Sequence, residues 1–145
     1  ISPVGRLDKD TTGLLLLTND VSLLHNLTSP NKNITKTYRV ECDRELTDEE
    51  MFLFESGIEI KDGNDLTFIT KKASIKKLDS YNYIVNISEG KFHQVKRMFK
   101  YFNSNVIDLE RLSFGPIKLD DKLEQGEYRE LTDSEIELLQ KSVMC

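Results

Sequence analysis

The sequence predicts an α+β domain in which a largely antiparallel mixed sheet is flanked by helices. Apolar residues alternate over residues 38–42 and 83–87, which is typical of strands with one buried face. Residues 47–50 and 132–135 form capping boxes, which mark the starts of helices. The turns between the expected strands are mostly too short for parallel crossover connections, which favours antiparallel pairing.

The first expected elements surround a run of four leucines at residues 14–17. Its apolar character predicts a short strand buried on both faces, fed by a turn that contains Asp8. Asp20 is expected to cap a short helix, which the break at residues 29–31 ends. That helix places three leucines inward: Leu23, Leu24 and Leu27.

The middle of the chain predicts one helix among several strands. A strand is expected over residues 37–42, with Tyr38, Val40 and Cys42 on one face. The capping box at Thr47 opens a helix that carries Met51, Phe52 and Phe54 and ends at Gly57. Further strands are expected over residues 58–61, 66–77 and 81–88.

Two helices are expected in the last third of the chain. Over residues 92–102, apolar residues recur three and four positions apart (Val95, Met98, Phe99 and Phe102), which predicts a helix with a core-facing stripe. A closing helix follows Thr132 and is expected to contribute Ile136, Leu138 and Leu139 to apolar contacts.

Composition indicates one soluble domain spanning residues 1–145. The chain is 38% hydrophobic and 31% charged, and no stretch has the apolar length that crosses a bilayer. Cys42 and Cys145 follow no metal-binding or redox spacing, and nothing resembles a signal peptide, so a cytoplasmic location is expected.

The net charge of −5 taken alone argues against a nucleic-acid partner, because such binding relies on basic side chains. The charge is unevenly distributed, however. Residues 120–137 contain eight acidic and two basic residues, which accounts for the whole deficit. Basic clusters occur elsewhere, around residues 32–39, 71–77 and 91–100, so a basic surface on one side of the domain is compatible with the sequence.

Three motifs resemble those of the RsuA family of pseudouridine synthases. Residues 5–20 read GRLDKDTTGLLLLTND, residues 36–38 read KTY, and residues 89–99 read EGKFHQVKRMF. The motifs occur in the family's order, and the similarity continues through residues 111–115 and 126–129. The resemblance implies the fold of a pseudouridine synthase catalytic domain. It also implies that a strand and a small RNA-binding domain precede this domain in relatives, so the chain is expected to be a fragment.

The resemblance implies that Asp8 is the nucleophile that starts cleavage of the uridine glycosidic bond. It further implies that Tyr38 stacks on the target base and that Lys96 is the charge partner of Asp8. Because the reaction is an isomerisation, no cofactor and no metal are expected. The residues considered alone also allow structural roles: a turn-capping acid for Asp8, a core aromatic for Tyr38, and a solvated helix face for Lys96 and Arg97.

The remaining expected site residues are RNA contacts: Arg6, Lys36, Lys91, His93, Gln94 and Arg97. Two of these have an open alternative, since Arg6 can instead brace the turn beside Asp8 and His93 can serve as a hydrogen-bonding residue at a helix start. The expected partner is ribosomal RNA or a partly assembled small ribosomal subunit, bound by a monomer without a membrane. The third motif favours 16S small-subunit RNA. The alternatives are a large-subunit synthase and a noncatalytic assembly factor of the same fold.

Overall fold

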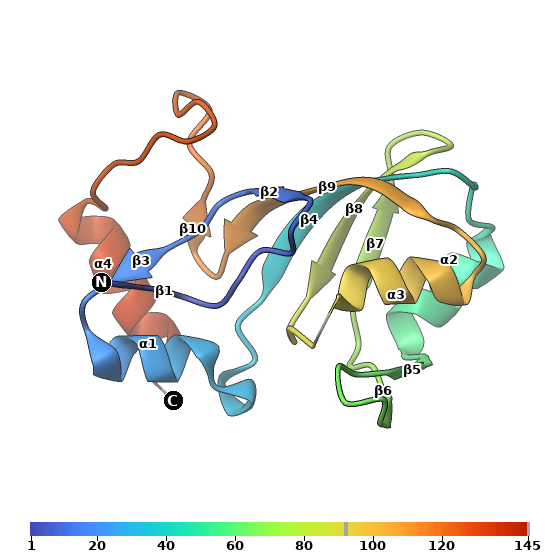
Figure 1. Ribbon diagram of the computed structural model, residues 1–145, viewed down its shortest axis with the longest axis horizontal. Coiled ribbons are helices and arrows are strands. Elements are labelled where there is room, and N and C mark those ends of the chain that lie inside the picture. The colour runs from blue at the N-terminus through green and yellow to red at the C-terminus, as the bar shows by residue number, and fades with distance from the viewer. Residues whose placement is uncertain (92, 145) are drawn as a thin grey trace.

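A central sheet organises the chain in the computed structural model, which describes residues 1–91 and 93–144 (Figure 1). The sheet order is β10 (Ile117–Lys118), β9 (Val106–Phe114), β4 (Lys36–Cys42), β8 (Asn82–Ile87) and β7 (Ser74–Lys77). These neighbours pair antiparallel, whereas β2 (Thr11–Gly13) runs parallel to β9 on the side away from β4. The predicted α+β class with a largely antiparallel mixed sheet is therefore confirmed.

The leucine run does not form the predicted buried strand. Strand β2 ends at Gly13, and the next strand, β3 (Leu17–Thr18), pairs with β1 (Ser2–Pro3) in a separate two-stranded sheet. Leu16 is buried, but Leu15 and Leu17 are 39% and 59% exposed. The prediction was wrong because the run connects two sheets, so only alternate leucines face the core.

The first helix confirms its predicted cap. Helix α1 (Val21–Thr28) begins where the Asp20 carboxylate accepts a hydrogen bond from the Leu23 backbone at 3.0 Å. Leu27 is buried, and Leu23 and Leu24 pack against the same core. The short helix η1 (Pro30–Lys32) follows and leads into β4.

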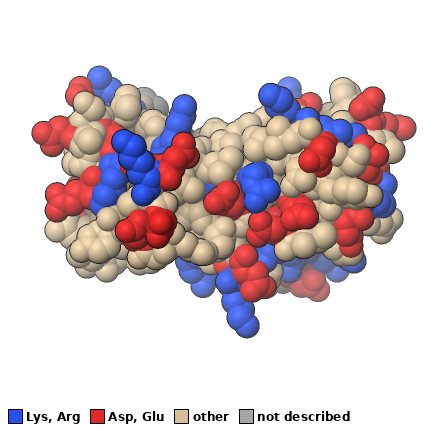
Figure 2. All heavy atoms as spheres, turned by 90° about the horizontal axis from the view of Figure 1, so that it is seen from above, with Lys and Arg blue, Asp and Glu red and all other residues tan. Residues whose placement is uncertain are grey.

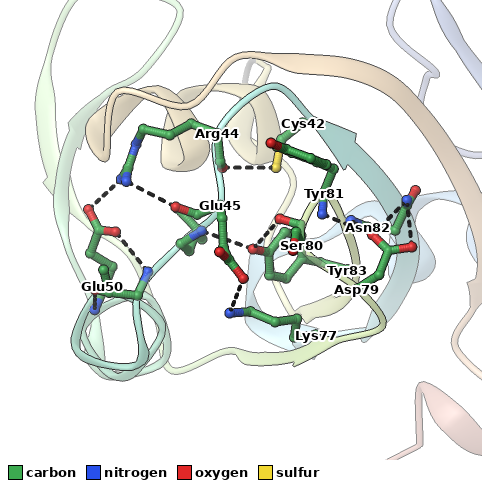
Figure 3. Close-up of polar contacts among 12 residues, drawn as sticks. Cys42, Arg44, Glu45, Glu50, Lys77, Asp79, Ser80, Tyr81, Asn82 and Tyr83 are labelled. Carbon is green, nitrogen blue, oxygen red and sulfur yellow. Dashed lines mark hydrogen bonds and ion pairs between the residues drawn. The ribbon is translucent and has the colours of Figure 1, made fainter.

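Helix α2 (Asp48–Ser56) begins with the predicted capping box of Thr47 and Glu50, and ends at Gly57, whose φ of 115° suits glycine. Phe54 is buried, whereas Phe52 is 67% exposed. Figure 3 shows the polar network that joins the start of α2 to β8: Arg44 Nη2 donates to Glu50 Oε2 at 2.6 Å, and the Tyr83 hydroxyl accepts from the Leu46 backbone at 2.9 Å.

The predicted strand over residues 66–77 is wrong, because two strands in different sheets occupy this range. Strand β6 (Thr67–Ile69) pairs only with β5 (Glu59–Lys61) among the described residues, while β7 joins the central sheet. The chain changes direction at Thr70, whose buried hydroxyl accepts from the Ile58 backbone at 2.9 Å. This bond and the one from Ala73 N to Glu55 O divert the chain between the two strands.

The predicted apolar stripe is confirmed in helix α3 (Gln94–Tyr101), which buries Val95, Met98 and Phe99; Phe92 lies outside the described residues. Helix α4 (Asp133–Ser142) confirms the second capping box but buries only Leu139 of the three expected residues, and Ile136 and Leu138 stay 39% and 49% exposed. The long strand β9 was not predicted.

The buried hydrophobic residues form two separate cores, and a cleft lies between them. One core lies where α2 and α3 pack on the sheet, and the other lies among α1, α4, β3 and β10 (Figure 1). The cleft opens between η1, the β5–β6 hairpin and the start of α3. Asp8, Tyr38 and the start of the third motif meet there.

Candidate active site

Asp8 lines this cleft and lies in the turn that leads into β2. The backbone of Thr11 donates to the Asp8 carbonyl at 2.9 Å, which closes the turn. Two residues after Thr11, Gly13 lies directly against Arg111 of β9, where a Cβ atom would overlap the Arg111 backbone. This close parallel pairing fixes the turn, and with it the Asp8 carboxylate, against the central sheet.

Two cationic or potentially cationic groups from α3 flank the Asp8 carboxylate. Lys96 Nζ lies 3.9 Å from Asp8 Oδ2, and His93 Nε2 lies 3.8 Å from Oδ1. His93 occupies the N-cap position of α3 with a φ of 49° and makes no side-chain cap bond, so its imidazole points to Asp8 instead. The carboxylate remains 28% exposed, which leaves it accessible to a substrate.

Tyr38 shares the cleft with Asp8 and lies opposite Arg111 in the pairing of β4 with β9. Burial raises the pKa of the Tyr38 phenol, and the positive charge of Arg111 opposes this shift. The nearby Asp8 carboxylate raises the same pKa further. The hydroxyl is therefore protonated at neutral pH and can donate a hydrogen bond.

Lys36 lies two residues before Tyr38 on the same face of β4 and also lines the cleft. Its pKa is lowered to about 8, first by burial and then by the positive charge of Arg111, with Lys71 adding to the effect and Glu89 opposing it. The charged form of Lys36 is therefore disfavoured in this place, and a negatively charged partner would stabilise it.

Two further residues of the expected RNA-contact set brace the start of α3. Gln94 is buried, its Oε1 accepts from the Lys91 backbone at 3.1 Å, and its Nε2 donates to Glu89 Oε1 at 3.1 Å. Lys91 Nζ lies 5.4 Å from the centroid of the Phe68 ring, at the rim of the cleft. The structure thus places Gln94 within the protein framework and Lys91 at the entrance.

Arg97 and Arg6 differ in their surroundings. Arg97 Nη1 donates to the carbonyl oxygens of Lys61 and Asp62 at 2.7 and 3.1 Å, which ties α3 to the β5–β6 hairpin. Arg6 is exposed and lines the cleft beside Asp8. Arg6 is therefore accessible to a ligand, while the guanidinium of Arg97 supports a wall of the cleft.

Sequence reasoning missed two buried polar residues of the cleft, Thr11 and Arg111. Arg111 is 3% exposed, and its Nε donates to the Leu14 carbonyl at 2.8 Å. Thr11 Oγ1 and Arg111 Nη2 are buried atoms without a hydrogen-bond partner in the structure. The available signal was the spacing of Leu109 and Arg111, which are two residues apart and so share one face of a strand, with the arginine at a core-facing position.

The cleft encloses about 650 Å³ and is more basic than the rest of the chain. Its described lining includes five basic residues (Arg6, Lys36, Lys71, Lys91 and Arg111) but only two acidic ones (Asp8 and Glu89). The face of the sheet away from α3 differs, because basic and acidic side chains are interspersed there (Figure 2). Arg39 on that face pairs with Asp108 at 3.1 Å and Glu110 at 3.7 Å.

The described residues contain no cluster of three metal-ligating side chains, and no helix among them is long and apolar enough to cross a membrane.

Comparison with known proteins identifies the family. Residues 1–101 match the model of the RNA pseudouridylate synthase family. The chain belongs to this family. Among pseudouridine synthases, it is 48% identical over 141 residues to the uncharacterized RNA pseudouridine synthase YtzG of Bacillus subtilis, covering 94% of the chain and 57% of that protein. It is 44% identical over 137 residues to the ribosomal small subunit pseudouridine synthase A of Haemophilus influenzae, covering 94% and 58%.

Solved structures agree with the fold. A pseudouridylate synthase crystal structure matches with a TM-score of 0.87 and 44% identity, over 94% of this chain and 58% of that one. A Cbf5-Nop10-Gar1 complex contains a chain with a TM-score of 0.59 and 14% identity, covering 83% of this chain and 42% of that one, which supports the fold alone. The resemblance to the RsuA family is confirmed, and the chain spans somewhat over half the length of these curated relatives.

Proposed function

We propose that the protein containing this chain is an RNA pseudouridine synthase that isomerises a uridine of ribosomal RNA. The observation that carries the proposal is the placement of Asp8, accessible in a basic cleft, between Lys96 and His93 and near Tyr38. A carboxylate that faces a polyanionic ligand is unfavourable for binding alone, so its presence there supports a chemical role.

The reaction begins when Asp8 attacks the uridine, at the ribose or at the base. The bond between C1′ of the ribose and N1 of uracil breaks, the base turns within the cleft, and C5 forms a new bond to C1′. C5 loses its hydrogen as a proton, N1 gains a proton, and Asp8 is regenerated. Uridine and pseudouridine are isomers, so the reaction consumes no co-reactant. The Lys96 ammonium, 3.9 Å away, stabilises the negative charge of Asp8 before attack and after release.

Tyr38 is suited to hold the base while it is detached. Aromatic stacking on an extruded base contributes about 1–3 kcal/mol. The raised pKa keeps the Tyr38 hydroxyl protonated, so the phenol can donate a hydrogen bond to a uracil oxygen. Tyr38 therefore combines a binding surface with a hydrogen-bond donor.

The names of the relatives support ribosomal RNA as the substrate, and small-subunit RNA in particular. The five basic residues of the cleft supply positive charge for phosphates in an otherwise acidic chain. We propose that the enzyme acts as a monomer, in the cytoplasm, on small-subunit RNA or a partly assembled small subunit.

Tritium release from C5-labelled uridine in small-subunit RNA tests this function. The intact protein is compared with Asp8→Asn and with Asp10→Asn, which alters an exposed aspartate two residues away. Release by wild type and Asp10→Asn, with none by Asp8→Asn, is the expected result. Release from large-subunit RNA alone would contradict the substrate, and RNA binding without release from any RNA would favour the noncatalytic assembly factor.

A further inference from the structure

Lys36 and Arg111 converge on one aromatic ring within the cleft. Lys36 Nζ lies 5.5 Å from the centroid of the Phe114 ring, and Arg111 Cζ lies 5.3 Å from the same centroid. The strand register explains this convergence, because β9 places Phe114 opposite Lys36 and Arg111 opposite Tyr38. The two cations therefore form a recess next to the tyrosine that is proposed to hold the base.

No carboxylate of the described residues forms an ion pair with this recess, although the charge of Glu89 acts on Lys36. Within residues 1–91 and 93–144, neither Lys36 nor Arg111 has a carboxylate within ion-pairing distance, and the Lys36 ammonium makes no hydrogen bond. Glu89, the acid whose charge acts on Lys36, is already engaged: its Oε1 accepts from the Lys71 backbone at 2.6 Å and from Gln94 Nε2 at 3.1 Å. The recess thus holds two positive charges that lack an anion.

Such an arrangement is costly unless a ligand completes it. Cations removed from water are destabilising without a negative partner, and a cation–π contact with Phe114 offsets only part of that cost. The lowered pKa of Lys36 reflects the same burial and repulsion. The buried Nη2 of Arg111, which has no partner, is a second unsatisfied donor in the recess.

We infer that the recess formed by Lys36, Arg111 and Phe114 binds a backbone phosphate adjacent to the target uridine. Lysine and arginine are the usual phosphate ligands in RNA complexes. Lys36 is two strand residues from Tyr38, a separation of about 6.6 Å, so one nucleotide can reach from the stacked base to the recess. The inference rests on the proposed function, because it assumes that Tyr38 holds a uracil.

The binding of uridine and of uridine 3′,5′-bisphosphate to the intact protein tests the inference. We expect the bisphosphate to bind at least tenfold more tightly than uridine to wild type. In Lys36→Met this preference should fall below threefold, while Lys72→Met, which alters an exposed lysine outside the cleft, should retain it. Equal binding of the two ligands by wild type, or an unchanged preference in Lys36→Met, would overturn the inference.

Inorganic phosphate serves as a third ligand. If it binds as tightly as the bisphosphate, the recess is a site for free phosphate and the inference fails. A second measurement is independent of any variant: NMR titration of the Lys36 side chain in wild type. The bisphosphate should raise the Lys36 pKa by at least one unit and uridine should leave it unchanged; no rise with the bisphosphate would contradict a phosphate contact.

These measurements separate the recess from the catalytic proposal, since neither requires turnover. A protein that prefers the bisphosphate through Lys36 but releases no tritium from any RNA would retain the recess and lose the proposed function. An active protein without that preference would lose the recess alone.

Discussion

Gly13 of β2 lies so close to the backbone of Arg111 in β9 that no side chain fits between them. The φ of Gly13 is 108°, a conformation that residues with a Cβ rarely adopt. Asp8 lies in the turn that leads into β2, and Arg111 lies on β9, so this contact holds the proposed nucleophile against the sheet.

Gly13→Ala should therefore be strongly destabilising. Strain at positive φ and overlap with backbone atoms together predict a loss of about 3 kcal/mol or more in the free energy of unfolding. Gly126→Ala is the matched control, since Gly126 has a φ of 88° but no atom near its missing Cβ, and should cost only about 1 kcal/mol. Urea denaturation measures both, and equal losses would show that the contact with Arg111 is unimportant.

Replacing Lys96 should slow the reaction with little effect on RNA affinity. Lys96→Met removes the cation 3.9 Å from Asp8 Oδ2, and we expect kcat to fall about 100-fold. Lys100→Met, one helical turn later, removes a lysine that bonds Asn105 at 3.0 Å and should leave kcat unchanged. Single-turnover kinetics with saturating enzyme gives the rate of the chemical step. A normal rate in Lys96→Met would remove Lys96 from the catalytic group.

The two roles of Tyr38 can be separated by substitution. Tyr38→Phe keeps the ring and should bind RNA like wild type while turning over more slowly, because the donating hydroxyl is lost. Tyr38→Ala removes the stacking surface and should weaken RNA binding by about 5- to 150-fold, the equivalent of about 1–3 kcal/mol. Fluorescence anisotropy with a labelled RNA measures affinity. Equal affinity of the two variants would count against stacking.

Lys36 should make the free energy of unfolding depend on pH in the alkaline range. Its pKa in the folded protein is lowered to about 8, while in the unfolded chain it returns toward 10.5. Between these values the unfolded state binds more protons, so this group raises stability as pH increases from about 8 to about 10.5. Below about pH 8, the cost of burying the ammonium is fully present.

Lys36→Met should consequently stabilise the protein at pH 7 by about 1–3 kcal/mol, and this gain should shrink toward pH 10.5. Thermal denaturation at pH 7 and pH 10 measures the difference, with Lys72→Met as the control. A destabilised Lys36→Met at pH 7 would mean that Lys36 is satisfied in the folded protein.

Arg97 should act through the β5–β6 hairpin. Arg97→Met removes the guanidinium bonds to the carbonyl oxygens of Lys61 and Asp62, so amide hydrogen exchange should accelerate across residues 59–69. Lys100→Met, which alters another α3 cation whose ammonium bonds Asn105 at 3.0 Å, should leave this exchange unchanged. If exchange in the hairpin is unaffected in Arg97→Met, direct RNA contact becomes the better account of Arg97.

Local signals in the sequence predicted much of the fold. Both capping boxes, the Asp20 cap and the stripe of Val95, Met98 and Phe99 are confirmed, because each depends on groups within about one helical turn. The wrong predictions concern strands whose extent depends on pairing with segments far away in the sequence. The leucine run turned out to link two sheets, and the strand expected over residues 66–77 was split between two sheets at Thr70.

The sequence by itself determined the approximate extent of the helices, strands β4 and β8 of the central sheet, the family, and the identity of Asp8, Tyr38 and Lys96 as the candidate group. Only the tertiary structure decided that Arg111 belongs beside Tyr38, that Lys36 shares a ring with it, and that the guanidinium of Arg97 lies on the hairpin. The physical reason is the distance along the sequence over which each interaction acts. Caps and periodic stripes act over a few residues, whereas the pairing of β9 with β2 and β4 joins segments that are about 70 to 100 residues apart, and their register follows from packing of the whole sheet.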